Sequence, residues 1–319
     1  MPYRAVIICA RGEQSFPPDQ VKRLRLASDA VFHARLNPLS KEEFIRLCRD
    51  ADIVAVTRRS VKELGADILG ELPALKGLAI YATGYDWVDH YHLAARGVPL
   101  SYLPDWAAVS VAEHVMGLML AMSRRVHLSH DRVRGLVPEG VSLCGWELRG
   151  KKLGIIGLGR IGQRVAKLAV AFGMEVYYYD LERKSVTGAS YLPLSELLRS
   201  CDVISLSASR RYGEPPILTR ENIRLIKKGA CVINAGRPAL ADTPALIKAI
   251  NDGRLVGYAV DETLEDSLLG EIRDYGRVLQ TGHTAWYSRE AIARGTSRWA
   301  DNIIALAVDS PINVLNPEG

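Results

Sequence analysis

One short segment restricts the possible folds of this chain more than any other. A Gly-x-Gly-x-x-Gly pattern follows an apolar run at 153–156 and opens an amphipathic stretch; its positions are Gly157, Gly159, Arg160, Ile161 and Gly162. In such a strand–turn–helix unit the first glycine permits a tight turn and the second lets the backbone approach a pyrophosphate. The third lets helix and strand pack closely, and the positive end of the helix faces the negative charge.

The next apolar run strengthens this interpretation. It predicts a strand at 175–179 that ends in Asp180, 23 residues after Gly157. A carboxylate at this place accepts both ribose hydroxyls of NAD and repels the 2′-phosphate of NADP. The alternative is an ordinary strand–turn–helix unit with incidental glycines, but the combination with Asp180 favours a dinucleotide site. We expect NAD as the cofactor.

Short apolar runs alternate with amphipathic stretches along the chain. In the first hundred residues they predict strands at 5–9, 53–56 and 78–81 and helices at 20–27, 41–49 and 89–96. From residue 151 they predict strands at 153–156, 175–179, 203–206, 230–234, 256–260 and 278–280, and a last helix at 289–306. A looser segment at 134–150 indicates a boundary nearby. This alternation predicts an α/β fold with doubly wound parallel sheets.

Composition narrows the class of protein. At 319 residues and 48% apolar content, the chain is long enough for about two domains. The net charge of +5 is too small and too scattered for a nucleic-acid footprint, and the longest apolar stretch, 115–122, is too short to span a membrane. The five cysteines are odd in number and lack disulfide or zinc spacing, which is typical of thiols in a reducing, cytoplasmic compartment.

Three chemically active residues follow predicted strands. Arg237, Asp261 and His283 each stand at the carboxyl end of a strand, where open α/β sheets bind ligands. Reduction of a 2-oxo acid needs a fork that grips carboxylate and carbonyl, a proton donor, and a group that keeps the donor charged. Arginine, histidine and a carboxylate supply these three functions.

Several longer motifs accompany these residues. They are Thr-Gly-Tyr-Asp-Trp-Val-Asp at 83–89, Ala-Ala-Arg-Gly-Val-Pro at 94–99, Ser-Val-Ala-Glu at 110–113, Gly-Trp at 145–146, Gly-Ile-Ile-Gly-Leu-Gly-Arg-Ile-Gly at 154–162, Cys-Asp-Val-Ile-Ser-Leu at 201–206, Ile-Asn-Ala-Gly-Arg at 233–237 and Gly-His-Thr-Ala-Trp at 282–286. With them the chain resembles the D-isomer-specific 2-hydroxyacid dehydrogenase family over nearly its whole length.

The resemblance implies an organisation and an activity. Two Rossmann-like domains would enclose a cleft, with a discontinuous substrate domain at 1–103 plus 288–319 and a dinucleotide-binding domain at 104–287. A helix near 105–125 would join the domains and form a homodimer. The protein would be an NAD-dependent enzyme that interconverts a small 2-oxo acid and a D-2-hydroxy acid.

The resemblance also implies roles for single residues. Arg237 would bind the substrate carboxylate and polarise the carbonyl, while His283 would protonate the new alkoxide. Backbone amides of Thr83 and Gly84 would hold the other side of the carboxylate. The expected cofactor-binding residues are Gly157, Gly159, Arg160, Ile161, Gly162, Asp180, Ala208, Ala235, Gly236, Arg237, Asp261, His283 and Ala285.

The chain departs from the family pattern in two places. The glutamate that usually pairs with the histidine, 29 residues after the arginine, is Asp266 here. Asp266 is the favoured partner of His283, and Glu265 is the alternative. The usual His-x-Pro after the fourth strand is Ser207-Ala208-Ser209, followed by Arg210 and Arg211. This arginine pair is either a solvated run or a site that tolerates the 2′-phosphate of NADP, so NADP stays an alternative cofactor.

A few further residues have two interpretations each. Arg58 and Arg59 follow the strand at 53–56, so they either capture a second anionic group on the substrate, such as a phosphate or phosphonate, or form an exposed basic turn. Trp286 either shapes the pocket wall or packs at the domain joint. Two histidine pairs, His90 with His92 and His127 with His130, lack acidic or cysteine partners, so we expect no metal.

Three other functions are known on the same scaffold. Pro-Asp at 104–105 and the closing Ser-Pro-Ile-Asn-Val-Leu-Asn are similar to phosphite dehydrogenase, but Thr83 stands where that enzyme has a lysine. Formate dehydrogenase has glutamine where Asp266 stands, and a neutral amide does not hold a histidine charged. A non-catalytic protein that binds NADH as a signal is the alternative from a different class.

Overall fold

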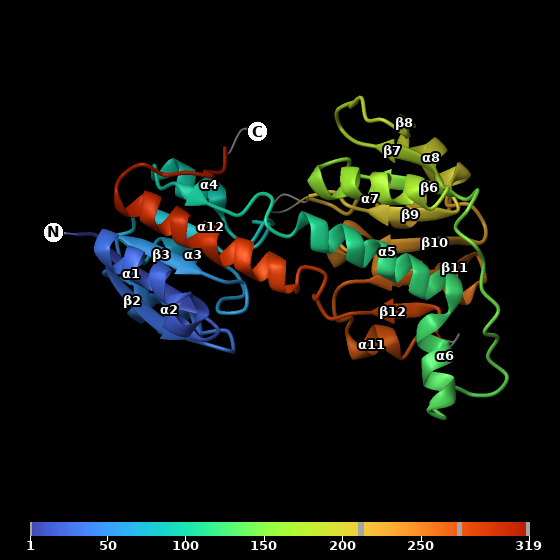
Figure 1. Cartoon of the computed structure of the whole chain (residues 1–319), viewed down its shortest axis with the longest axis horizontal. Coiled ribbons are helices and arrows are strands. Elements are labelled where there is room, and N and C mark those ends of the chain that lie inside the picture. The colour runs from blue at the N-terminus through green and yellow to red at the C-terminus, as the bar shows by residue number, and fades with distance from the viewer. Residues whose placement is uncertain (1, 210–213, 273–275, 317–319) are drawn as a thin grey trace. The chain divides into compact units, whose positions relative to one another are not determined.

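The computed structural model describes residues 2–209, 214–272 and 276–316, so Arg210 and Arg211 lie outside the described residues. The described chain divides into two compact units (Figure 1). Unit 1 contains residues 2–107 and 288–316, and unit 2 contains the described residues from 108 to 287. Each unit is built on one parallel sheet.

The sheet of unit 1 has five parallel strands in the order β2-β1-β3-β4-β5. Their bounds are β1 (Arg4–Cys9), β2 (Asp29–Ala34), β3 (Ile53–Val56), β4 (Gly77–Ile80) and β5 (Leu100–Ser101). The central strands are fully buried because helices cover both faces. These helices are α1 (Pro18–Ala27), α2 (Lys41–Cys48), α3 (Ala66–Leu69), α4 (His90–Ala95) and α12 (Arg289–Ala307), with a short 3₁₀ turn at Gly12–Ser15.

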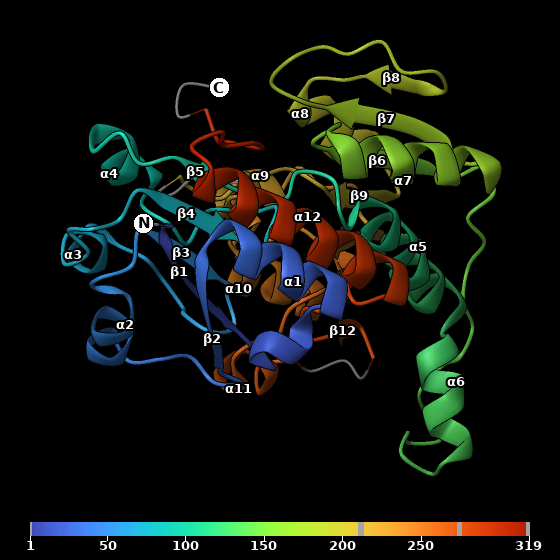
Figure 2. The ribbon, with the colours of Figure 1, turned by 60° about the vertical axis from the view of Figure 1, so that its left-hand side comes forward.

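The helix α12 returns the end of the chain to the sheet that the first hundred residues form. It begins after Ser288, whose side chain accepts a hydrogen bond from the Ala291 amide, and it packs against α1, β3 and β4 (Figures 1 and 2). Trp299 is buried in this contact and its indole N–H donates to the Ala79 carbonyl at 3.1 Å. Gly295 lets α12 approach the rings of Tyr81 and Trp106, because an added Cβ would lie 2.4 Å from both.

The sheet of unit 2 has seven parallel strands in the order β12-β11-β10-β9-β6-β7-β8. Their bounds are β6 (Lys152–Ile156), β7 (Glu175–Tyr179), β8 (Ala189–Tyr191), β9 (Val203–Leu206), β10 (Ala230–Asn234), β11 (Leu255–Val260) and β12 (Val278–Gln280). The chain runs outward from β6 in one direction and from β9 in the other. The carboxyl ends of β6 and β9 therefore form the crevice where doubly wound sheets bind ligands.

Two hydrophobic clusters cover the two faces of this sheet. Ile155 belongs to the cluster under α5 (Ala108–Arg124) and α7 (Arg160–Ala171). Its neighbour Ile156 belongs to the cluster under α8 (Leu194–Ser200), α9 (Arg220–Ile223) and α10 (Thr243–Asn251). Successive residues of a strand point to opposite faces, so the near-continuous apolar strands of the sequence follow from burial on both sides. The remaining helices are α6 (Val126–Val133), α11 (Asp266–Leu269) and a 3₁₀ turn at Pro238–Leu240.

The predicted fold class is confirmed: both units are α/β with doubly wound parallel sheets. The strands missed by the sequence analysis are β2, β5 and β8, which all lie at sheet edges. The looser segment at 134–150 lies inside unit 2, so the boundary expected near it is wrong; the unit changes between Ala107 and Ala108. Within the described residues, no helix is long and apolar enough to cross a membrane.

Candidate active site

The glycine-rich turn after β6 fits a dinucleotide for three separate reasons. Gly157 has φ +93°, and a Cβ there would lie 2.5 Å from the Cα of Ala208, at the end of β9. A Cβ at Gly162 would lie 2.2 Å from the Gly157 carbonyl oxygen, so α7 packs against the turn only with glycine. Gly159 caps α7 and faces open space, where the first amides of α7 and the exposed Arg160 are free to meet an anion.

Asp180 follows β7 and accepts a hydrogen bond from the glycine-rich turn. Its Oδ2 accepts hydrogen bonds from the Leu158 amide and from Lys184 Nζ, both at 2.8 Å, and its Oδ1 accepts from the Leu181 amide. Burial alone would raise the pKa of Asp180, but these hydrogen bonds outweigh burial and lower it. The carboxylate is therefore charged, and part of its hydrogen-bond acceptor capacity is already used.

Arg237 stands in a turn that Asn234 shapes. Asn234 is buried at the end of β10, donates to the Arg237 carbonyl at 2.9 Å, and accepts from the Gly236 amide at 3.1 Å. These bonds fix residues 234–237, and Arg237 lies half-buried with its Nη1 donating to the Gly236 carbonyl. The sequence analysis did not select Asn234, although a polar residue that ends a buried apolar strand is a usable signal.

Asp261 is buried at the end of β11 and holds the loop that carries His283. Its Oδ1 accepts from the Thr281 hydroxyl at 2.8 Å and from the Thr284 amide at 2.7 Å, and its Oδ2 accepts from the Ala285 amide at 2.8 Å. His114 on α5 adds a contact of 3.0 Å between its Nε2 and the Thr281 hydroxyl. Because that hydroxyl donates to Asp261, it accepts from His114, which assigns a hydrogen to Nε2.

His283 pairs with a carboxylate that the sequence analysis did not select. Its Nδ1 lies 3.2 Å from Glu262 Oε2, and its backbone has φ +62°, a conformation that is uncommon for a non-glycine residue. Asp266, the expected partner, is exposed at the first position of α11, and Glu265 accepts from Ser267 instead. Among the described residues neither of them forms an ion pair with His283. The chain turns into α11 after Glu262, and this turn carries both later carboxylates away.

Unit 1 carries the remaining predicted substrate residues. Arg58 and Arg59 are exposed in the turn after β3, next to the place where the strand order of this sheet reverses, between β1 and β3. Thr83 is exposed after β4 and its hydroxyl donates to the Leu103 carbonyl at 2.7 Å. Gly84 accepts through its carbonyl from the Trp87 indole at 3.0 Å. These bonds fix the loop that carries the two backbone amides.

Of the other expected residues, Ile161, Ala208, Ala235 and Trp286 are half-buried, and Ala285 is buried. All five lie in unit 2, and Trp286 packs edge-to-face on Tyr287 with ring centroids 5.1 Å apart. Within the described residues, no group of three or more His, Cys, Asp or Glu side chains is arranged to hold a metal ion.

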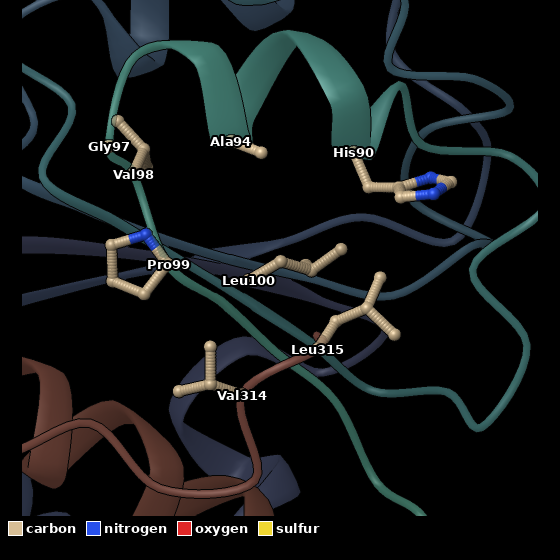
Figure 3. A pocket seen from close by; sticks show the side chains of 8 residues that line it. All are labelled: His90, Ala94, Gly97, Val98, Pro99, Leu100, Val314 and Leu315. Carbon is tan, nitrogen blue, oxygen red and sulfur yellow. The ribbon is translucent and has the colours of Figure 1, made fainter. Parts of the chain in front are cut away.

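A pocket of about 250 Å³ lies elsewhere, in unit 1 (Figure 3). It is formed by α4, β5 and the segment after α12, and His90 is its one ionisable lining residue among the described residues. None of the predicted site residues lines it. We assign no role to this pocket.

Known proteins are similar to this chain in sequence and in fold. Residues 116–285, more than half of the chain, match the description "D-isomer specific 2-hydroxyacid dehydrogenase, NAD binding domain". The chain belongs to this family. A glyoxylate reductase of Aeropyrum pernix is 31% identical over 94% of this chain and 93% of its own length. The family resemblance stated from the sequence is thus confirmed.

Solved structures agree over the whole chain. An acyclic imino acid reductase in complex with NADPH and D-Arg has a TM-score of 0.86 at 28% identity, covering 98% of this chain and 100% of its own. A D-lactate dehydrogenase from Aquifex aeolicus, complexed with NAD and lactic acid, has a TM-score of 0.80 at 25% identity, covering 96% of each chain. The dehydrogenase is therefore an NAD(P)-dependent enzyme that acts on 2-hydroxy or 2-oxo acids.

Proposed function

We propose that the dehydrogenase reduces a small 2-oxo acid to the corresponding D-2-hydroxy acid with NADH. The observation that carries this proposal is the set Arg237, Asp261 with Glu262, and His283, which follow the adjacent strands β10, β11 and β12. Carboxyl ends of neighbouring parallel strands share one sheet edge, so these groups serve one ligand. The glycine-rich turn after β6 opens on the same edge.

Each group has a task that suits its chemistry. The guanidinium of Arg237 offers parallel N–H donors to the substrate carboxylate and carbonyl, which polarises the carbonyl carbon. NADH, when bound, supplies the hydride. His283 donates a proton from Nε2 to the new alkoxide while Glu262 holds Nδ1. On unit 1, the backbone amides of Thr83 and Gly84 are proposed to hold the substrate carboxylate as well.

We also propose that the substrate carries a second anionic group, such as a phosphate or phosphonate. Arg58 and Arg59 support this, because both are exposed after β3 and make no ion pair within the described residues. Two exposed cations at a topological switch point are suited to an anion. An exposed basic turn without a ligand is the competing interpretation.

The test is the loss of reduced-nicotinamide absorbance with a panel of 2-oxo acids that carry neutral, carboxylated, phosphorylated or phosphono side chains. We expect turnover with at least one class and a loss of at least about 100-fold in His283→Ala, since general acid catalysis contributes about 10²–10⁴-fold. The double variant Arg58→Gln/Arg59→Gln should raise the KM only for those 2-oxo acids whose side chain carries a second anionic group. Tight NADH binding without turnover on any acid would refute the reductase and favour an NADH-sensing protein.

The assembly and location that we propose are a homodimer in the cytoplasm. We expected the dimer contact on the helix near 105–125, which is α5, and we propose that it includes the helix α6 that follows. The helix α6 and the loop after it extend away from the sheet of unit 2 in both views (Figures 1 and 2), and they expose Val126 at 58% and Val133 at 89%. Exposed valines on an extended element favour burial against a second copy. The five cysteines are free thiols, four of them buried, which is typical of a reducing compartment.

A further inference from the structure

The loop after β7 places a lysine on the carboxylate that would discriminate between cofactors. Lys184 Nζ lies 2.8 Å from Asp180 Oδ2, and the exposed fractions of the two side chains are 34% and 17%. An aspartate at this position favours NAD because it is negative and accepts from ribose hydroxyls. Here the negative charge is paired before any ligand arrives.

Tyr178 holds the backbone of Lys184 in place. The hydroxyl of Tyr178, a buried residue of β7, donates to the Lys184 carbonyl and accepts from the Lys184 amide at 2.8 Å. Most exposed ion pairs contribute little because two flexible side chains must be ordered. In this loop Tyr178 already orders the lysine backbone, so less entropy is lost when the pair forms.

The neighbouring charges do not replace Lys184 in this contact. Arg183 is exposed and its guanidinium lies 4.4 Å from the ring centroid of Tyr191 on β8, where it is held by a cation–π contact. Glu182 is exposed as well and forms no ion pair within the described residues. Lys184 is therefore the one cation with a described hydrogen bond to Asp180.

The donors and acceptors that Asp180 and Lys184 still have free determine which dinucleotide the pair can bind. A carboxylate has about four acceptor positions, and three on Asp180 are taken by the amides of Leu158 and Leu181 and by Lys184. Two ribose hydroxyls of NAD would thus compete with Lys184. The ammonium of Lys184 has three donors and uses one on Asp180, so it can still donate to a 2′-phosphate.

We propose that Lys184 sets the cofactor range of this enzyme: by pairing with Asp180 it lets the site accept the 2′-phosphate of NADPH as well as the ribose of NADH. This inference rests on the proposed function only in placing the adenosine ribose beside Asp180. It assigns to a single side chain the choice that the sequence analysis left open between NAD and NADP.

The experiment measures binding, so it does not depend on the oxo acid. Dissociation constants for NADH and NADPH are determined by titration calorimetry, together with adenosine 5′-monophosphate and adenosine 2′,5′-bisphosphate, which differ only in the 2′-phosphate. We expect NADH and NADPH to bind the unaltered protein within about tenfold of each other. Lys184→Met should weaken NADPH and the bisphosphate by about tenfold, as one good charge-assisted hydrogen bond would, and leave NADH unchanged or tighter.

Three variants make the result specific. Lys184→Arg should restore NADPH binding because it restores the charge. Lys227→Met is the matched control, since Lys227 forms a similar pair with Asp202, 2.7 Å away, at the opposite end of the same sheet. Its ratio of NADPH to NADH affinity should equal that of the unaltered protein. Lys184→Gln serves as a second neutral variant if Lys184→Met does not fold.

The outcomes separate the inference from the function. An unaltered protein that binds NADPH more than about 100-fold more weakly than NADH overturns the inference alone, as does an unchanged ratio in the Lys184 variants. Failure to bind either dinucleotide refutes the cofactor site itself. Normal binding with no oxo acid reduced refutes the reductase while leaving Lys184 in its role.

Discussion

At the scale of single residues, the carboxylate that pairs with His283 is Glu262 and not the expected Asp266. Glu262 directly follows the buried Asp261 and reaches Nδ1 of His283, whereas Asp266 begins α11 and is exposed. A group four residues earlier thus takes the position that the family pattern gives to a later one. Removing the charge of Glu262 and removing the charge of Asp266 should therefore affect catalysis differently.

We predict that Glu262→Gln lowers kcat for oxo-acid reduction by at least about tenfold, because His283 then lacks a negative partner, and general acid catalysis contributes about 10²–10⁴-fold. Asp266→Asn should change kcat less than about twofold, since Asp266 is exposed and His283 forms its described ion pair with Glu262. Steady-state kinetics distinguish the two, and Glu262→Asp, which keeps the negative charge, should restore part of the rate. The opposite order of effects would return the role to Asp266.

The sequence could select Arg237, Asp261 and His283 as candidates because each follows a recognisable strand within three residues. It favoured Asp266, with Glu265 as the alternative, and did not select Glu262, although the three carboxylates lie within five residues of each other. That choice depends on where the chain leaves β11 for α11 and on the left-handed backbone of His283, and neither has a strong local signal. Lys184 was missed for a similar reason, because its contact with Asp180 depends on the anchoring of its backbone by Tyr178.

At the scale of elements, the loop that carries His283 is attached to α5 through His114, Thr281 and Asp261. Burial lowers the pKa of His114 below its usual value, although the charge of Asp261, 3.7 Å away, acts in the other direction. A histidine with a lowered pKa takes up a proton when the protein unfolds. Its contribution to stability is therefore present above the unfolded pKa and is lost as the pH falls through the lower, folded pKa.

We predict that the midpoint of thermal unfolding falls as the pH is lowered from about 6.5 to 5, the range below the unfolded pKa of histidine. Burial lowers the pKa of His33 and His127 too, so His114 supplies only part of this dependence. His114→Gln keeps a donor for Thr281 but cannot titrate, so its midpoint should change less with pH. Parallel curves for the two proteins would contradict the assignment. Calorimetric scans at several pH values provide the measurement.

The contact of α12 with the unit 1 sheet gives a prediction on packing. In Gly295→Ala the new methyl group would meet Trp106 and Tyr81 at 2.4 Å, and overpacking of this kind costs about 1–3 kcal/mol. Gly117→Ala on α5 is the control, because nothing lies within 4 Å of its methyl group. Both changes gain about 1 kcal/mol of helix propensity. Urea denaturation should therefore rank Gly295→Ala below Gly117→Ala by about the clash energy, and equal midpoints would show that the rings move aside freely.

The sequence predicted the central strands and the edge strand β12, but it missed the edge strands β2, β5 and β8. The predicted strands at 53–56, 175–179, 203–206, 230–234 and 278–280 match β3, β7, β9, β10 and β12 to the residue. Strand β2 is half-exposed along most of its length and β8 has three residues, so neither shows a continuous apolar run. Periodicity detects burial on two faces, and an edge strand is covered less completely.

At the scale of the whole molecule, the exposed valines of α6 bear on assembly. Val133→Glu places a charge in the surface that we propose to be buried between two copies, and an unpaired buried charge is strongly unfavourable. We predict a shift from dimer to monomer, observed by light scattering after size-exclusion chromatography. Leu26→Glu is the control, because Leu26 is 77% exposed on α1 of unit 1. A monomeric parent protein, or a dimer that persists in Val133→Glu, would exclude α6 as the interface.

The return of α12 to unit 1 also has a consequence for the order of events during synthesis. The strands β1 to β5 are made first, but the helix that covers them with Trp299 is made last. About 200 residues separate the two, which at a synthesis rate of about 5–20 residues per second corresponds to roughly 10–40 s. Unit 2 is continuous and can fold within this interval. The first third of the nascent chain therefore waits with an apolar sheet face open, and this is the stage at which we expect chaperones to bind.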